Sequence, residues 1–337
     1  MCAWGIPGFL PKRKRRSRFY WKKWGGDHFE RKPMLGVSTS FRSEISNSGM
    51  EVIDAVLDLG VEAVELEYRI TLPMLKEILP VLKKRRIRAV SLHNFCPLPE
   101  EVPKEKASGD VFSLSSPDKD ERDLAVKYTL RTLEWAEELE VKAVVLHMGK
   151  IPMDSPMETI LKLYDQKKIH TAEGREFIRE QKKIRAGKGQ LHLDAAMRSL
   201  DRLVREADRR GVLLGLENRY NIYDFPNLKE FKVLFQEFSG SPARYWHDIG
   251  HAATQQNLGL ENQKELLEQF GDLLVGVHLH GCKGYKDHEA PGSGEEDYTL
   301  IKKFLKPDTI RVVETHHRAT REAMLRGLGF LKEQGIT

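Results

Sequence analysis

Four side chains that can bind a metal ion stand at the ends of short apolar runs in this chain. The runs GVLLGLEN, ARYWHD, LVGVHLH and TIRVVE carry, at or near their last residue, Glu217, Asp248, His278 and Glu314. A carboxylate at the end of a buried strand is costly unless a partner compensates its charge. Two Glu, one Asp and one His form the mixed oxygen and nitrogen set that a divalent cation binds. The set predicts a metalloenzyme, although any one of these residues alone is equally consistent with a core salt bridge.

Three more histidines are candidates for binding substrate or a second metal ion. His251 lies three residues after Asp248 in a D-x-x-H arrangement, where its alternative role is to cap the start of a helix. His93 and His147 end two earlier apolar runs. We expect these two to polarise a substrate or to bind a second metal ion, and the alternative is that each is a buried polar group with its own partner.

Several residues close to these ends are weaker candidates. His280 and His288 are expected near the mouth of the site, where they can contact ligands or substrate. Arg219, Lys150 and Lys283 follow three of the runs and can bind a substrate phosphate, unless they are solvated surface residues.

The parity of residues along a strand separates two aromatic neighbours of Asp248. Trp246 shares a strand face with Asp248 and is expected either to form a wall of the pocket or to pack inside the barrel. His247 has the opposite parity and is expected to be structural. His316 and His317 are expected at the surface.

The elements that must position these residues alternate regularly from residue 34 onward. Period-2 and short apolar runs predict strands over 35–38, 62–67, 87–93, 142–147, 212–217, 243–248, 273–279 and 310–314. Segments with 3.6-residue periodicity predict helices near 48–59, 71–84, 117–139, 191–210, 227–237, 260–270, 298–305 and 319–333. Eight strands alternating with eight helices indicate an α/β fold, a closed (β/α)8 TIM barrel rather than an open sheet.

The residues on each strand face support closure. Residues two positions apart in a strand share a face, so Glu217 shares a face with Gly215, and His278 shares a face with Gly276. Glu65 falls on the same inward face by this count. Small residues beneath the ligands are expected in a narrow barrel, because its interior is filled by layers of larger side chains.

Two insertions follow the carboxyl ends of strands, where TIM barrels place their active sites. Residues 94–116 form a Pro-rich loop after strand three, and residues 150–190 form a charged, largely helical segment after strand four. We expect breaks in the second at Gly174 and at GKG (187–189). Both should overhang the site within a single barrel domain covering 34–337.

The charge is distributed unevenly along the chain. Residues 1–33 carry ten Lys/Arg and two Asp/Glu, whereas the other 304 residues carry 45 basic and 48 acidic side chains. We expect the tail to be a disordered basic extension, with nucleic-acid binding or targeting by KRKRRSR as the alternative. Three scattered Cys, the lack of a long apolar run and the lack of a signal-peptide pattern predict a cytoplasmic protein without a membrane span.

Lined up in order, the strand ends resemble the xylose isomerase-like TIM barrel superfamily. This superfamily includes ketose 3-epimerases, sugar phosphate isomerases/epimerases, inosose dehydratases and endonuclease IV-type enzymes. The resemblance spans residues 34–333 and is carried by SLHNFCP (91–97), VVLHMGK (144–150), LEN (216–218), WHDIGHA (246–252), VHLHG (277–281), HEAPGSG (288–294) and VVET (312–315). No single segment is specific, so the order of the set carries the resemblance.

The resemblance implies one divalent metal ion, Mn²⁺, Mg²⁺, Co²⁺ or Zn²⁺, bound by Glu217, Asp248, His278 and Glu314, with a second ion as a further option. It also implies a sugar or sugar phosphate isomerase/epimerase in which Glu217 and Glu314 are the acid/base pair. Removing a proton next to a carbonyl needs a base, and the metal-stabilised enediolate needs nearby positive charge. The implied partner is a small carbohydrate, and the oligomeric state is left open.

Other activities stay open at this point. An endonuclease IV-type zinc phosphodiesterase acting on abasic DNA has counterparts of most of these ligands, but its pattern needs an Asp two residues before His288. Lys286 stands there, and Asp287 is expected in the wrong register. The net acidic barrel also lacks the basic stripe that nucleic acid requires, so a nucleic-acid partner is not expected. A dehydratase of the superfamily and a barrel that only binds its ligand are the remaining alternatives. No Gly-rich phosphate loop suggests a nucleotide cofactor.

Overall fold

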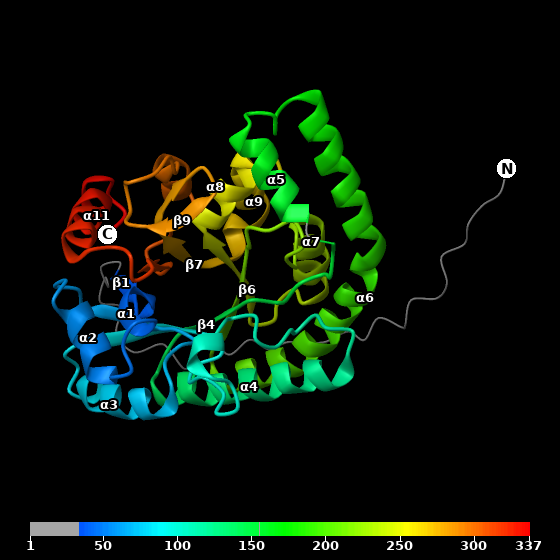
Figure 1. Cartoon of the computed structure of the whole chain (residues 1–337). Helices are drawn as coiled ribbons and strands as arrows, with labels where there is room; N and C mark the ends of the chain where they lie inside the picture. The colour runs from blue at the N-terminus through cyan, green and yellow to red at the C-terminus, as the bar shows by residue number, and fades with distance from the viewer. Residues whose placement is uncertain (1–33, 155) are drawn as a thin grey trace.

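The computed structural model describes residues 34–154 and 156–337, which form a closed barrel of parallel strands surrounded by helices (Figure 1). Around the barrel the strands follow the order β1, β2, β3, β4, β5, β6, β7 and β10, and β10 pairs with β1. Parallel pairing brings all carboxyl ends to one rim. The predicted (β/α)8 TIM barrel is confirmed.

The barrel strands agree with the predicted ones to within one residue at each end. Their bounds are β1 Leu35–Ser38, β2 Ala63–Leu66, β3 Arg88–His93, β4 Ala143–Leu146, β5 Leu213–Glu217, β6 Ala243–Asp248, β7 Leu274–Leu279 and β10 Ile310–Val313. The agreement is close because apolar, β-branched runs between turn residues leave little choice of register in a fully buried parallel sheet.

Trp246 fills the inside of the barrel beneath the strand ends. It is fully buried and belongs to one apolar cluster with Ala143 and Val145 of β4. A Cβ added to Gly215 would lie 2.9 Å from the Trp246 ring, and one added to Gly276 would lie 2.2 Å from it. The two inward glycines therefore make room for the indole. Of the two expectations for Trp246, the structure supports packing inside the barrel.

Helices cover the outside of the barrel, and most begin at a side-chain cap. Asp118, Thr171, Asn227 and Asn262, for example, each accept a hydrogen bond from a free N–H of the first turn. The bounds are α1 Ser40–Ser43, α2 Gly49–Leu57, α3 Leu72–Lys83, α4 Lys119–Glu138, α5 Pro156–Asp165, α6 Ala172–Arg210, α7 Leu228–Glu237, α8 Ile249–Asn257, α9 Gln263–Phe270, α10 Tyr298–Lys302 and α11 Arg321–Glu333. Short 3₁₀ turns occupy Lys104–Lys106 and Gly271–Leu273.

The insertion after β4 is more regular than predicted. The expected breaks at Gly174 and at residues 187–189 are wrong, because α6 runs through both as one helix of 39 residues. Gly174 lies in the first turn, where its N–H donates to Thr171, and the chain ends the helix only at Gly211 in the left-handed region. Many good helix formers between these points outweigh the cost of interior glycines.

This insertion forms one side of the rim. In Figure 1, α5 and the first half of α6 project beyond the barrel. Ile160 of α5 and Ile178 of α6 share a buried cluster, separate from the main core, with Ile222 after β5 and Leu258 after α8. The insertion is thus anchored to elements at the carboxyl end of the barrel, as its place in the sequence predicts.

Helix α1, helix α8 and the strands β8 and β9 were not predicted. Helix α1 has only four residues. Helix α8 (IGHAATQQN) has no apolar periodicity, since several of its small and polar residues are buried. The antiparallel pair β8 Gly281–Lys283 and β9 Lys286–Glu289 is built largely from polar residues. Hydrophobic patterning cannot detect these elements.

Two further expectations concern the basic tail and the crossing of a membrane. The basic tail, residues 1–33, lies outside the described residues, so its expected disorder and the domain start at 34 stay predictions. Among the described residues, no helix is both long and apolar enough to cross a membrane.

Candidate metal centre

The four residues predicted to bind metal meet at the carboxyl-end rim of the barrel. The Nδ1 atom of His278 lies 2.9 Å from Glu217 Oε1, 2.9 Å from Glu314 Oε2 and 3.6 Å from Asp248 Oδ2. One ligand atom from each of the four lies within 4.8 Å of all the others. All four side chains are buried. We refer to Glu217, Asp248, His278 and Glu314 as the quartet.

The quartet has the charge that a divalent cation requires. It contributes three carboxylates, and in the described part of the chain neither Asp248 nor Glu314 has an ion pair with a Lys or Arg. Burial alone would lower the pKa of His278, but Glu314 and the other carboxylates raise it well above its usual value. This strongly negative potential fits a metal ion, which would take the place of the proton.

Glu65 orients His278 within the quartet and was assigned no role from the sequence. Its two oxygens lie 3.2 Å from His278 Nε2, and its side chain is fully buried. Ser91 donates a hydrogen bond of 2.6 Å to Glu65 Oε2. With Nε2–H held by Glu65, Nδ1 of His278 is free to face the other three residues. Carboxylates behind metal-binding histidines commonly fix the ring in this way. The inward parity of Glu65 was visible in the sequence.

Asp248 is held by His280, which directly follows β7, and by the first turn of α8. His280 Nε2 lies 2.9 Å from both Asp248 oxygens, and the backbone N–H of His251 donates to Asp248 Oδ1 at 2.6 Å. Burial would lower the pKa of His280, yet Asp248 raises it to about 9. His280 thus contacts a quartet residue rather than completing the quartet itself. His251 stands in the first turn of α8 but does not cap it, because the cap is Asp248. Its ring faces the site, with Nδ1 3.8 Å from Glu217 Oε1.

A second group of possible ligands lies beside the quartet. His251, Asp287 and His288 each offer an atom within 4.8 Å of the others, and so do Asp248, His280 and His288. His251 Nε2 lies 3.8 Å from Asp287 Oδ2, and His288 Nδ1 lies 3.0 Å from Asp287 Oδ1. The prediction that Asp287 stands in the wrong register to reach the site is therefore wrong. The β8–β9 turn and the left-handed backbone of His288 (φ 59°) bring Asp287 to the site, which sequence spacing cannot show.

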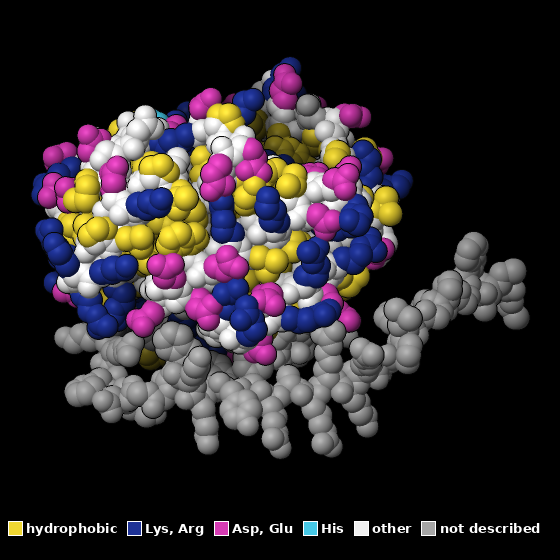
Figure 2. Space-filling model, turned by 90° about the horizontal axis from the view of Figure 1, so that it is seen from below, with side chains coloured by type: hydrophobic (Ala, Val, Ile, Leu, Met, Phe, Trp, Pro, Cys, Tyr) yellow, Lys and Arg dark blue, Asp and Glu magenta, His cyan; other side chains and the backbone are white. Residues whose placement is uncertain are grey.

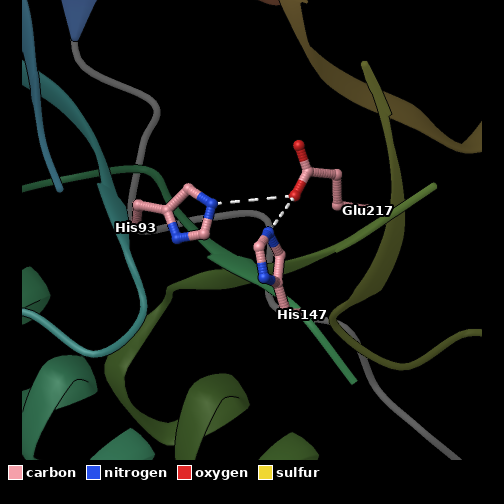
Figure 3. A group of neighbouring side chains, drawn as sticks. All are labelled: His93, His147 and Glu217. Carbon is pink, nitrogen blue, oxygen red and sulfur yellow. Dashed lines mark ion pairs between the residues drawn. The ribbon is translucent and has the colours of Figure 1, made fainter. Parts of the chain in front are cut away.

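A third group comprises His93, His147 and Glu217. Figure 3 shows both imidazole rings turned toward one Glu217 oxygen, Oε2, with His93 Nε2 at 3.6 Å and His147 Nε2 at 2.7 Å. These histidines end β3 and follow β4, as their inward parity predicted. Burial would raise the pKa of Glu217, but His147 and His278 hold it well below its usual value.

Arg219 belongs to this third group as well. Its Nη1 atom lies 2.6 Å from His147 Nε2 and 3.6 Å from Glu217 Oε2, and the residue is only 7% exposed. It is thus a buried part of the site. Lys150 and Lys283 are exposed, although Lys150 Nζ lies 3.4 Å from Asp110 Oδ2.

Asp110 is a site residue that the sequence did not reveal. It lies in the Pro-rich loop after β3, and its oxygens are 3.4 Å from His147 Nδ1 and 3.4 Å from Arg219 Nη2. A Cβ added to the preceding Gly109 would lie 2.6 Å from His147. The loop therefore packs directly on the third group, as its position after a strand end suggested. A single Asp in a loop without periodicity gives no signal of this contact.

The remaining aromatic residues follow the predictions with one exception. His247 is structural, as expected, because its ring contacts Tyr245 Oη and Gln263 and burial lowers its pKa to about 4. His316 is not a surface residue, since it is half-buried and its ring stacks on His288 with centroids 4.0 Å apart. The turn after β10 folds back over the rim, which a strand-end count cannot show. His317, whose side chain is 34% exposed, stays at the surface as expected and pairs with Glu44.

The family described as "Xylose isomerase-like TIM barrel" matches residues 53–334, and no curated protein matches. A D-tagatose 3-epimerase-like protein is 20% identical with a TM-score of 0.60, covering 90% of this chain and 97% of its own. A 3-keto-D-glucoside 4-epimerase from E. coli is 17% identical with a TM-score of 0.62, covering 90% and 100%. A D-allulose 3-epimerase from Methylomonas sp., in complex with D-allulose, is 13% identical with a TM-score of 0.61, covering 90% and 97%.

At these identities the structural matches establish the shared fold, while the family match covers most of the sequence. The match begins within α2, extends past the end of α11 and includes every residue of the quartet. The chain therefore belongs to the xylose isomerase-like TIM barrel family.

Proposed function

We propose that this chain is a metal-dependent sugar or sugar phosphate isomerase/epimerase. A divalent cation bound by the quartet would supply the positive charge that stabilises an enediolate next to the substrate carbonyl. The fit of the quartet to such an ion rests on its three converging carboxylates and its one oriented imidazole. The sugar epimerases among the structural neighbours support the same class of substrate.

The observation that carries the proposal is the placement of two glutamates on opposite sides of His278. Glu217 ends β5 and Glu314 follows β10, two strands that are separated around the barrel by β6 and β7. Each lies 2.9 Å from His278 Nδ1. Two carboxylates that approach one point from different sides can remove a proton from one face of a substrate carbon and return it to another.

The surroundings keep both glutamates charged. The pKa of Glu217 and that of Glu314 are held well below the usual value by neighbouring histidines, although burial would raise them. Both are therefore carboxylates at neutral pH, ready to accept a proton. His288 Nε2, 3.9 Å from Glu314 Oε2, can contact a substrate hydroxyl at the same side of the site.

Turnover in deuterated water tests this reaction. The protein is loaded with Mn²⁺, Mg²⁺, Co²⁺ or Zn²⁺ and supplied with free ketoses and ketose phosphates, and the products are examined by NMR. We expect a stereoisomer or an aldose–ketose pair that carries deuterium at the reacting carbon. A loaded protein that converts none of these substrates would remove the proposal.

A second candidate, the zinc phosphodiesterase acting on abasic DNA, is favoured by one observation. Asp287 reaches His251 and His288 and completes one of four overlapping groups of possible ligands among the described residues, so possible ligands extend well beyond the quartet. Against it stand the net acidic barrel and the guanidinium of Arg219 inside the third group. Chelator-sensitive cleavage of an abasic-site duplex, without ketose turnover, would reverse the order of the two candidates.

A further inference from the structure

Arg219 occupies the place that a second metal ion would take at His93, His147 and Glu217. Its Nη1 atom lies 2.6 Å from His147 Nε2. A divalent transition metal bound to a histidine lies at roughly 2.0–2.1 Å from the ring nitrogen. The same nitrogen lies 2.7 Å from Glu217 Oε2, so it stands between a guanidinium and a carboxylate. A metal ion bound to this nitrogen would have to displace the Arg219 guanidinium, which already lies at hydrogen-bond distance.

The loop after β3 holds this arrangement in place. Asp110 Oδ2 lies 3.4 Å from Arg219 Nη2, and Asp110 Oδ1 lies 3.4 Å from His147 Nδ1. Asp110 therefore contacts both Arg219 and His147 and holds the two side chains next to each other. The absence of a Cβ at Gly109 lets the loop backbone approach the His147 ring closely.

The charges of the third group balance without a metal ion. Two carboxylates, Asp110 and Glu217, face two cationic side chains, Arg219 and Lys150, at 3.4–3.6 Å. Since Arg cannot be deprotonated in proteins, its charge is permanent. An ion added here would meet a fixed, buried positive charge, in contrast to the quartet.

We propose that Arg219 is a resident cation that replaces a second metal ion at the His93–His147–Glu217 group. The chain then binds metal through the quartet while the guanidinium neutralises the outer oxygen of Glu217. This inference concerns only which positions hold cations, so it stands or fails independently of the substrate.

Metal content measured in paired variants tests the inference. Arg219→Ala removes the cation and the guanidinium that lies against His147 Nε2, so we expect one additional Zn²⁺ per chain relative to the wild type after dialysis. The two-histidine, one-carboxylate set suits Zn²⁺ better than Mg²⁺, so no gain is expected with Mg²⁺. Arg219→Lys keeps a positive charge and should show no gain. The double variant Arg219→Ala/His147→Ala should return to the wild-type content.

A single variant that leaves Arg219 intact provides an independent check. His147→Ala should leave the metal content of the wild type unchanged, because no ion uses this ring. Loss of one Zn²⁺ per chain in a folded His147→Ala protein, judged by its circular dichroism, would overturn the inference. So would an unchanged Zn²⁺ content in folded Arg219→Ala.

Discussion

The two oxygens of Glu217 face two different surroundings. Oε1 lies 2.9 Å from His278 in the quartet, where three carboxylates meet one imidazole. Oε2 lies 2.7 Å from His147 in the third group, where a guanidinium and two imidazoles meet the carboxylates of Glu217 and Asp110. Both groups contain residue types that bind metals, and they share one residue. They differ in whether a protein cation is already present.

If the quartet holds the metal ion and the third group does not, as we propose, ligand types alone do not define a metal site. A divalent ion and a fixed guanidinium about 4 Å apart repel each other by roughly 8 kcal/mol at an effective dielectric constant of about 20. Nearby carboxylates offset part of this repulsion, but in the third group they already pair with Arg219 and Lys150. Charge balance therefore favours the quartet as the metal site.

The largest expected effect comes from removing the charge of a quartet glutamate. Glu314→Gln keeps the shape of the side chain but removes the proposed base, so turnover should fall by about 10²–10⁴-fold. Substrate binding should change much less. Steady-state kinetics with the metal content measured in parallel separate the two effects. Full activity in this variant and in Glu217→Gln would end the two-glutamate mechanism.

The orientation of the quartet should depend on Glu65. Glu65→Gln keeps a hydrogen-bond acceptor for His278 Nε2 but removes the charge, and we expect metal affinity to fall by about 10–100-fold. Ser91→Ala is a milder control, since it removes only the hydrogen bond that holds Glu65. Competition with a chromophoric chelator measures both affinities. Equal affinities of Glu65→Gln and the wild type would show that Glu65 does not act on the metal site.

A larger residue at position 109, in the loop after β3, should press on the His147 ring and lower the stability of the protein. Gly109→Ala places a Cβ about 2.6 Å from the buried His147 ring, and we expect a loss of about 1–3 kcal/mol in the free energy of unfolding. Gly187→Ala is the matched control, because nothing lies within 4 Å of the added Cβ inside α6. It should gain about 0.5–1 kcal/mol. Urea unfolding in the presence of a chelator measures both, and an unaffected Gly109→Ala protein would contradict the packing described for this loop.

The smallest expected effect is that of removing the basic tail. A chain that begins at Met34 should keep its melting temperature and its turnover, because residues 1–33 have no apolar pattern that could join the barrel. It should also show no chelator-sensitive cleavage of abasic DNA. Loss of stability or turnover on truncation would assign the tail a role in the fold or the site.

The strands and the quartet could be predicted because both follow from simple periodicity. A ligand at the end of a buried run, with glycine two residues earlier, fixes the rim and the inward face together. Asp110 could not be predicted, since its contact with Arg219 joins residues 109 positions apart through a loop without a pattern. Asp287 was misplaced because the polar β8–β9 pair changes the spacing that the sequence suggests. Glu65 was visible on the inward face, but only the contact with His278 Nε2 gives it a role.

The continuity of α6 illustrates a different limit. Glycine is the usual signal for the end of a helix, and the GKG sequence was interpreted accordingly. Here the glycines lie between strong helix formers, and only Gly211, with its positive φ, ends the helix. The helix propensities summed over all residues of the segment decide whether the helix continues, rather than one or two glycines.

The position of Trp246 has a practical consequence. Its indole lies against the His278 ring, with centroids 5.0 Å apart. The full sequence has five tryptophans, three of them in residues 1–33, so a chain beginning at Met34 would retain only Trp135 and Trp246. Replacing Trp135 with Phe would leave one fluorophore at the floor of the quartet. A paramagnetic ion such as Co²⁺ should quench its emission, so the protein contains its own optical reporter of site loading.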